Sequence, residues 1–392
     1  MVERGIDGSV TPESERSAAV AELCDALESI DAEGWYPMIE VQRPWSTHNP
    51  RITGEFSCPR TIRHYLEREL RSLLALGATV TVRPSRPSTP IDDPSLLRAL
   101  DETAWEMRAK KLFLFAPERM ALSMERLEHY CGTPPEAFQR YVLFTNYAMH
   151  VEEFCAHYPD AEGPDRPVQM PAWHQRTDAQ DGVTIIDIGV GPSNAKTVTD
   201  HLAVLRPDAM VMIGHCGGLR NHQDLGDFVL ATAYVRDDRI LDRALPLTVP
   251  VIPNHRLNSY LLGALDARHE RYRIGTVLTT GNRNWELEID SMWRTFEQSR
   301  AVAVDMESAT IATNGFRYRI PNATLLAVSD KPLHGRPKQA EMATAFYQAS
   351  RRAHVEIALE CIDRVRREHP SGIPNADIRS PDEPLFGAPA TE

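Results

Sequence analysis

The sequence contains no apolar run that approaches the roughly 20 residues needed to cross a bilayer. Its first residues, Met1 to Val10, are polar and lack the apolar core of a secretory signal. It also lacks an excess of basic residues, because 43 lysines and arginines stand against 55 aspartates and glutamates and give a net charge of −12. These absences argue against a membrane protein and against a protein whose main partner is a nucleic-acid backbone. We expect a cytoplasmic protein in which any phosphate site is built from a few local donors.

Cysteine is scarce, and its few positions do not form a Cys-x-x-Cys pair or show the spacing of metal ligands. Such scattered cysteines are typical of reduced, mostly packed thiols in a cytoplasmic protein. The sequence therefore predicts no metal site and no disulfide framework. The six residues are Cys24, Cys58, Cys131, Cys155, Cys216 and Cys361.

The length of 392 residues favours two domains. The segment 161–171 contains three prolines and one glycine and marks the boundary between them. We therefore predict a smaller α+β domain over 15–165, a catalytic domain over 168–367 and a flexible tail over 368–392. In the first domain the pattern predicts a helix over 61–76 that stops at Gly77, and strands over 79–82, 111–115 and 141–145.

The second half alternates short apolar runs with helical patterns. The run 183–188 predicts a buried strand, 193–205 a helix, and 210–213 the next strand. A strand, a crossover helix and a second strand imply a parallel pair, and hence an α/β domain with three αβα layers. Further strands are expected over 228–234, 274–280, 301–304 and 324–328, and a long terminal helix over 341–367.

The loop after the first strand of this half is rich in glycine. Gly189, Gly191 and Ser193 lie between a predicted strand and a predicted helix, where backbone N–H groups and the helix N-terminus favour an anion. A dinucleotide-binding turn is the rival interpretation, but it requires Gly or Ala where this sequence has Asn194, and Pro192 fits it poorly. A tight turn without a ligand is also open.

A second glycine-rich segment follows the next strand. Gly217, Gly218 and Arg220 suit a phosphate or oxyanion, since Arg220 is a forked donor at the carboxyl end of a strand. His215 and Cys216 are adjacent and therefore point apart on a strand, which argues against a cysteine nucleophile.

Two further strand ends carry carboxylates. Glu307, at the start of a predicted helix, is suited to accept hydrogen bonds from a vicinal diol, with Met306 against the sugar; alternatively, Asp305 and Glu307 only favour the helix N-terminus. Asp330 follows the last buried strand, where burial should raise its pKa and suit it to act as a general acid, unless it only caps the next helix.

Long segments of the chain resemble the nucleoside phosphorylase/nucleosidase superfamily, and within it the bacterial AMP nucleosidases. In the second half the resemblance lies in DIGVGPSNAK (187–196), HLAVLRP (201–207), MIGHCGGLR (212–220), TGNRNWEL (280–287), DMESATIA (305–312) and SDKPLHG (329–335). In the first half it lies in TPPEAFQRYVLFTNY (133–147) and QMPAWH (169–174).

The resemblance implies a nucleoside-phosphorylase-like catalytic domain that hydrolyses AMP to adenine and ribose 5-phosphate. Asp330 matches the family's aspartate that protonates N7 of the leaving purine, and Glu307 with Met306 matches its ribose-binding pair. Asn284 and Trp285 fall where the family contacts the base. The positions that hold phosphate in the phosphorylases are matched by Gly189, Gly191, Ser193, Gly217, Gly218 and Arg220, which in a hydrolase position water or the 5′-phosphate.

The resemblance also implies a homo-oligomer, typically a hexamer, with regulation by MgATP and phosphate through the N-terminal domain. No cofactor is expected for the chemistry itself. Three other functions stay open: phosphorolysis of a nucleoside, nucleotide sensing without turnover, and a dinucleotide-dependent oxidoreductase, which Pro192 disfavours.

Overall fold

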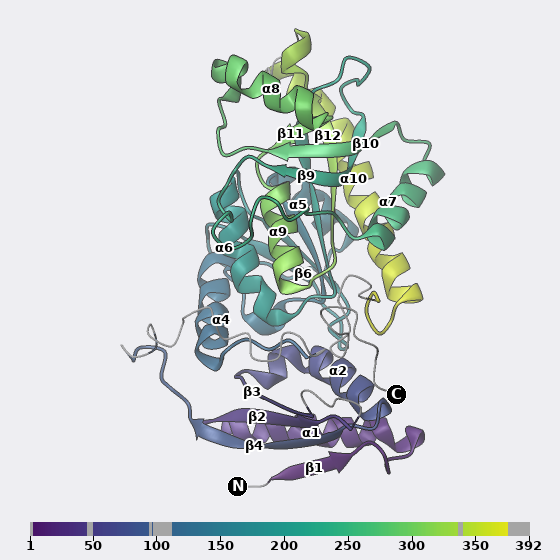
Figure 1. Ribbon diagram of the computed structural model, residues 1–392. Coiled ribbons are helices and arrows are strands. Elements are labelled where there is room, and N and C mark those ends of the chain that lie inside the picture. The colour runs from purple at the N-terminus through teal and green to yellow at the C-terminus, as the bar shows by residue number, and fades with distance from the viewer. Residues whose placement is uncertain (1–2, 45–49, 94–95, 97–111, 336–339, 375–392) are drawn as a thin grey trace, which may run out of the picture. The chain divides into compact units, whose positions relative to one another are not determined.

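The computed structural model describes residues 3–44, 50–93, 96, 112–335 and 340–374, with only the backbone described over 340–349 (Figure 1). Residues 375–392 of the predicted tail therefore lie outside the described residues. The chain forms two compact units. The first contains the residues up to Arg126 together with Val204–Arg206, and the second contains Leu127–Ala203 and Pro207–Asn375.

The first unit is an α+β domain, as predicted. Its antiparallel sheet has the order β1 (Arg4–Asp7), β4 (Thr79–Pro87), β2 (Trp35–Gln42), β3 (Arg51–Glu55). Helices α1 (Glu13–Ala32) and α2 (Arg63–Ala75) pack against each other, and α1 also packs on β2 and β4. The predicted helix end at Gly77 is confirmed, because Gly77 has a φ of 81° that favours glycine. Residues 112–115 form no strand, in contrast to the prediction.

The second unit holds the larger sheet. In chain order its elements, with the helix that leads into it, are α4 (Pro117–Cys131), β5 (Tyr141–Thr145), α5 (Ala148–His157), β6 (Ala172–Gln175), β7 (Val183–Asp187), α6 (Pro192–Leu202), β8 (Ala209–Gly218), β9 (Phe228–Arg236), α7 (His255–Ala267), β10 (Tyr272–Thr279), α8 (Ile289–Ser299), β11 (Ala303–Asp305), α9 (Ser308–Tyr318), β12 (Asn322–Asp330) and α10 (Ala340–Glu368). Across both units, short 3-10 turns occur at η1 (Pro59–Ile62), η2 (Pro135–Ala137), η3 (Ala203–Leu205), η4 (Trp285–Glu288) and η5 (Pro332–His334).

The larger sheet closes partly on itself. In the described part of the chain its order is β11-β10-β9-β12-β8-β5-β7-β6, and β11 pairs with β8 as well as with β10. The second pairing joins β8, β12, β9, β10 and β11 into a ring. It also brings the ends of β8, β11 and β12 to one place, although the three segments are far apart in the sequence.

Helices cover both faces of the sheet, which confirms the three-layer αβα prediction. One apolar cluster joins strand residues such as Leu143, Val211 and Leu325 to α5, α7 and α10, and α7 and α10 run side by side (Figure 1). On the other face, Cys216 and Val328 pack with residues of α9. The odd-numbered positions of β8 therefore face α5 and α10, and the even-numbered ones face α9.

The predicted domain boundary near residue 165 is wrong. Strand β5 lies between β8 and β7 and pairs with both in parallel, so residues 127–165 belong to the second unit. The predicted parallel pair of β7 and β8 is likewise separated by β5. The proline-rich segment that suggested the boundary is a loop within the unit, because a strand that starts the sheet lies before it.

No helix in the described residues is long and apolar enough to span a membrane. All six cysteines are free thiols, and four of them are buried, as expected for packed cysteines.

Candidate active site

The end of β8 lies between the ends of two other strands. Gly217 is in register with Val304 of β11 on one side and with Asp330 of β12 on the other. A Cβ atom at Gly217 would lie 3.1 Å from Cγ1 of Val304 and 3.5 Å from Oδ2 of Asp330. A side chain at Gly217 would therefore be crowded by Val304, and the Asp330 carboxyl group lies within van der Waals distance of the same position.

Asp330 is buried at the last position of β12, with 9% of its surface exposed. Its Oδ1 accepts a hydrogen bond of 2.5 Å from the Ser329 hydroxyl. The turn η5 follows it, and its N-cap residue Lys331 makes no side-chain cap hydrogen bond. The next residue, Lys331, donates to the Asn221 and Gln223 carbonyls and fixes the loop after β8.

Glu307 is buried, with 1% exposed, and connects three strand ends. Its Oε1 accepts a 2.6 Å hydrogen bond from the N–H of Gly191, in the loop after β7. Its Oε2 accepts a 3.1 Å bond from Nδ2 of Asn146, directly after β5. Burial, assisted by the charge of Asp305, raises the pKa of Glu307 to about 8.

Asp305 has a structural role. Its Oδ1 accepts a 2.6 Å bond from the Thr279 hydroxyl, and its Oδ2 accepts from the N–H of Ser308 at 2.9 Å and from the Ser308 hydroxyl. Burial raises the pKa of Asp305, although these bonds act against the rise. The helix-start interpretation is thus right for Asp305, whereas Glu307 reaches out to two other segments.

The comparisons with known proteins agree with this geometry. A family model of the phosphorylase superfamily matches residues 140–363, which contain both carboxylates. The AMP nucleosidase of Escherichia coli (strain K12) is 39% identical over 90% of this chain and 89% of its own. The chain belongs to the phosphorylase superfamily and, within it, to the AMP nucleosidases.

Solved structures give the same fold. The crystal structure of AMP nucleosidase from Bacteroides thetaiotaomicron matches with a TM-score of 0.55 and 27% identity, over 64% of this chain and 98% of that one. Purine nucleoside phosphorylase from Toxoplasma gondii matches with a TM-score of 0.53 at 19% identity, over 60% of this chain and 94% of its own, and shows the fold alone. The predicted nucleoside-phosphorylase-like fold is therefore confirmed.

The glycine-rich loop after β7 has the form expected of an anion-binding turn, but the N–H groups of its two glycines already have partners. Gly189 and Gly191 have φ angles of 64° and 116°, which favour glycine. The Gly189 N–H donates to Asp187 and the Gly191 N–H to Glu307. Helix α6 begins at Pro192, and Ser193 in its first turn is exposed. The role of this loop toward phosphate or water stays a prediction.

In the loop after β8, the residues predicted to hold phosphate differ in their surroundings. Gly218 is close-packed, since a Cβ there would lie 2.8 Å from Cγ1 of Val328. Arg220 is half-buried, and its guanidinium donates to the Phe296 carbonyl of α8 at 3.3 Å. Binding of phosphate by Arg220 would require that this contact be exchanged for the ligand. Burial raises the pKa of the Cys216 thiol well above its ordinary value, in line with the absence of a role as nucleophile.

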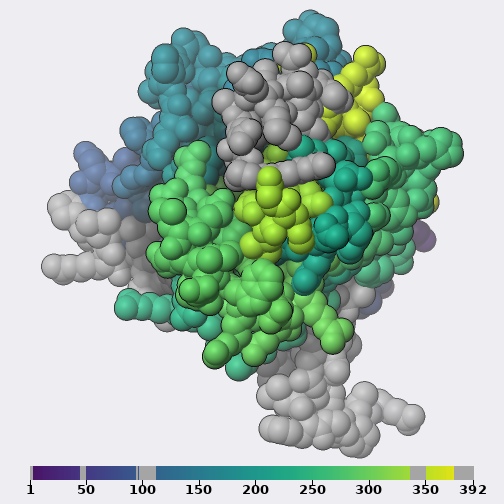
Figure 2. Space-filling model, turned by 90° about the horizontal axis from the view of Figure 1, so that it is seen from above, coloured from purple at the N-terminus to yellow at the C-terminus, as the bar shows by residue number. Residues whose placement is uncertain are grey.

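The two predicted base-contacting residues have different surroundings. Asn284 is exposed, and Trp285 is buried against Phe296, with ring centroids 5.2 Å apart in an edge-to-face arrangement. They precede α8, which belongs to the green part of the chain that forms much of the surface in Figure 2. Met306 is half-buried beside Glu307. Contacts of these residues with a ligand stay predictions.

Asn146 contacts Glu307 in the candidate site and was not predicted from the sequence. It directly follows β5, and carboxyl ends of parallel strands are where ligand-binding residues gather. Once β5 is placed in the catalytic sheet, this rule points to Asn146. Asn146 was not predicted as a site residue because the sequence analysis placed it in the N-terminal domain.

Proposed function

We propose that this chain hydrolyses the N-glycosidic bond of AMP and releases adenine and ribose 5-phosphate. The observation that carries the proposal is the 39% identity, along 90% of the chain, to an AMP nucleosidase. The buried carboxylates Glu307 and Asp330 at neighbouring strand ends support it.

In this proposal Asp330 is the general acid. As the C1′–N9 bond of AMP breaks, the ribose gains positive charge and the purine gains negative charge. A proton from Asp330 to N7 neutralises the leaving base, and the oxygen of water forms the new bond to C1′. Water then supplies the proton that restores Asp330, and atoms and charge balance.

Glu307 holds the ribose hydroxyls in this proposal. A carboxylate has about four lone-pair sites, and the Glu307 oxygens use one each for the Gly191 N–H and the Asn146 amide. Each oxygen therefore keeps a site for one hydroxyl of a vicinal diol. Hydrogen bonds from the diol favour the ionised carboxylate, which also stabilises the positive charge on the sugar.

The remaining roles follow from the family and complete the proposal. Met306 packs on the sugar, and Asn284 with Trp285 contacts the base. Gly189, Gly191, Ser193, Gly217, Gly218 and Arg220 position water or the 5′-phosphate. The protein acts in the cytoplasm as a homo-oligomer, with MgATP and phosphate as effectors.

The test is to incubate the purified protein with AMP, adenosine and IMP, each with and without inorganic phosphate, and to identify the products. The proposal expects adenine and ribose 5-phosphate from AMP without added phosphate, and much slower release from adenosine and IMP. Base release that requires phosphate and yields a ribose 1-phosphate would instead establish phosphorolysis. Binding of AMP without any product would leave a sensing protein.

A further inference from the structure

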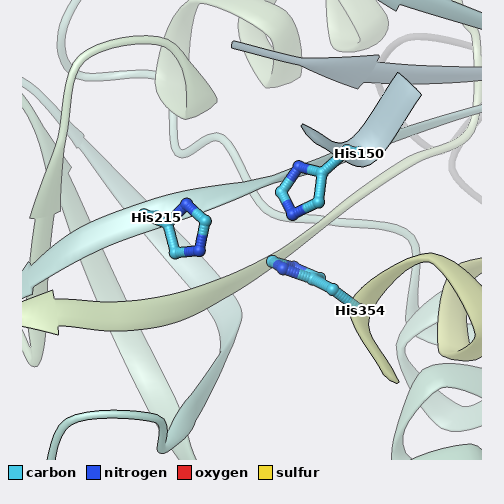
Figure 3. A group of neighbouring side chains, drawn as sticks. All are labelled: His150, His215 and His354. Atoms are coloured by element: carbon cyan, nitrogen blue, oxygen red, sulfur yellow. The ribbon is translucent and has the colours of Figure 1, made fainter. Parts of the chain in front are cut away.

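Three buried histidines outside the proposed mechanism meet in the second unit. His150 comes from α5, His215 from β8 and His354 from α10, and their rings turn toward a common centre (Figure 3). One ring nitrogen of each lies within 4.8 Å of the others. The ring centroid of His150 is 5.3 Å from that of His215 and 4.9 Å from that of His354.

The outer nitrogens of two of these rings are already fixed. Nδ1 of His150 lies 2.7 Å from the Thr145 hydroxyl, and Nε2 of His354 lies 2.7 Å from the Leu325 carbonyl. A carbonyl only accepts, so Nε2 of His354 carries the proton and Nδ1 is left with a lone pair. This arrangement, in which the second nitrogen of a histidine is held by a neighbouring oxygen, is the usual one for metal-ligating histidines.

Within the described residues, the inner ring nitrogens of His150 and His354, which are Nε2 and Nδ1 respectively, are buried without a hydrogen-bond partner. Leaving a buried polar atom unpaired costs about 1–3 kcal/mol, so such atoms require an explanation. His174 provides the contrast, because it is equally buried but pairs both nitrogens, with the hydroxyls of Thr184 and Thr133 at 2.9 and 2.8 Å.

The rings of His150 and His354 are neutral, as metal ligands must be. Burial, helped by the nearby His354, lowers the pKa of His150 well below its ordinary value. Burial also lowers the pKa of His354 to about 4. Both rings therefore keep a lone pair at neutral pH.

We propose that His150, His215 and His354 form a binding site for one divalent transition-metal ion of the zinc class. Three imidazoles suit zinc, cobalt or nickel, whereas magnesium and calcium require oxygen ligands. A zinc–nitrogen bond is about 2.0–2.1 Å, so ligand atoms within 4.8 Å of one another reach a shared ion when each ring moves by less than about 1 Å. The fourth position is taken by water, as in other three-histidine zinc sites.

The proposed metal site lies close in sequence to the strand ends of the candidate active site, and its role is structural. His215 lies two residues before Gly217 on β8, and Thr145, which holds His150, directly precedes Asn146 of the Glu307 network. An ion joining α5, β8 and α10 fixes these elements relative to one another. This role does not depend on the reaction catalysed, so it stands or falls separately from AMP hydrolysis.

The experiment uses the full chain without an affinity tag, stripped with a chelator and then dialysed against zinc, cobalt or magnesium. Mass spectrometry of the bound metal is expected to find about one zinc or cobalt per chain and no retained magnesium. Zinc is expected to raise the melting temperature, because an ion that binds only the folded state stabilises it. X-ray absorption of the wild-type zinc form is expected to show three imidazole ligands, a result that needs no variant to fold.

The matched variants are His354→Gln and His215→Gln in the cluster and His174→Gln outside it. The cluster variants are expected to lose more than tenfold in zinc occupancy and all of the thermal shift, whereas His174→Gln keeps both. Wild-type protein that retains no zinc, or cluster variants that retain as much as wild type, would overturn the proposal.

Discussion

Asp305 and Glu307 lie two residues apart at the start of α9. Both are buried, but their carboxylates differ in their hydrogen-bond partners. Asp305 accepts from Thr279 on one oxygen and twice from Ser308 on the other, so its acceptor sites are largely filled by its own surroundings. Glu307 accepts once on each oxygen, from Gly191 and Asn146. Glu307 therefore keeps lone pairs that can accept hydrogen bonds from a ligand, whereas the lone pairs of Asp305 are largely used within the protein.

Asp330, at the end of β12, is a third buried carboxylate that extends the comparison. Asp330→Asn is expected to lower kcat on AMP by about 10²- to 10⁴-fold, the usual contribution of a general acid. The amide keeps the shape, so the affinity for AMP should change little. Steady-state kinetics and calorimetric titration measure the two effects, and an unchanged kcat would remove Asp330 from the mechanism.

Asp305→Ala tests the structural side of the comparison. It leaves the Thr279 hydroxyl and the start of α9 without their acceptor, so the free energy of unfolding should fall by roughly 2–4 kcal/mol. Denaturant titration measures the fall, and kcat per folded molecule should stay within about tenfold of wild type. A variant as stable as wild type would show that the Asp305 bonds contribute nothing.

Glu307→Ala tests whether Glu307 binds the ribose hydroxyls of the substrate. The loss of two hydrogen bonds to the sugar should lower kcat/KM on AMP by about 10- to 100-fold, and less on 2′-deoxy-AMP, which lacks one hydroxyl. The ratio of the two kcat/KM values measures the discrimination between the sugars, with Glu307→Gln as the control that keeps the shape. Equal losses on both nucleotides would contradict contact with the ribose hydroxyls.

The pH dependence of stability tests the ionisation of Glu307. The pKa of Glu307 is raised from 4.5 to about 8, so the folded protein binds this proton more tightly than the unfolded chain. The stability it contributes is complete below pH 4.5 and is lost as the pH rises through 8. The unfolding free energy of wild type relative to Glu307→Gln should therefore fall between pH 5 and pH 9. A constant difference would show that Glu307 is ionised throughout.

Much of the second unit could be predicted because its signals are local. Apolar runs followed by glycine or a carboxylate identified β7, β8 and β12, and Glu307 and Asp330 at strand ends. Ring closure through the pairing of β11 with β8 could not be predicted, because no local pattern specifies which distant strand β11 will meet. The placement of β5 failed for a similar reason, since a proline-rich loop resembles a domain linker.

The histidine cluster shows the same limit. Metal sites are readable in a sequence when their ligands are spaced on one element or turn, but His150, His215 and His354 come from three elements that meet only in the fold. The prediction of no metal site rested on spacing alone. Asn146, in contrast, was within reach, because it follows an apolar strand that the pattern did identify.

A change of leaving group tests whether Asp330 protonates the departing purine. In 4-nitrophenyl β-D-ribofuranoside 5-phosphate the leaving group departs as a stable anion and needs no proton. If Asp330 is the general acid, Asp330→Asn loses about 10²- to 10⁴-fold in kcat on AMP and only a few-fold on this compound. An equal loss on both substrates would show that Asp330 does not act as the general acid.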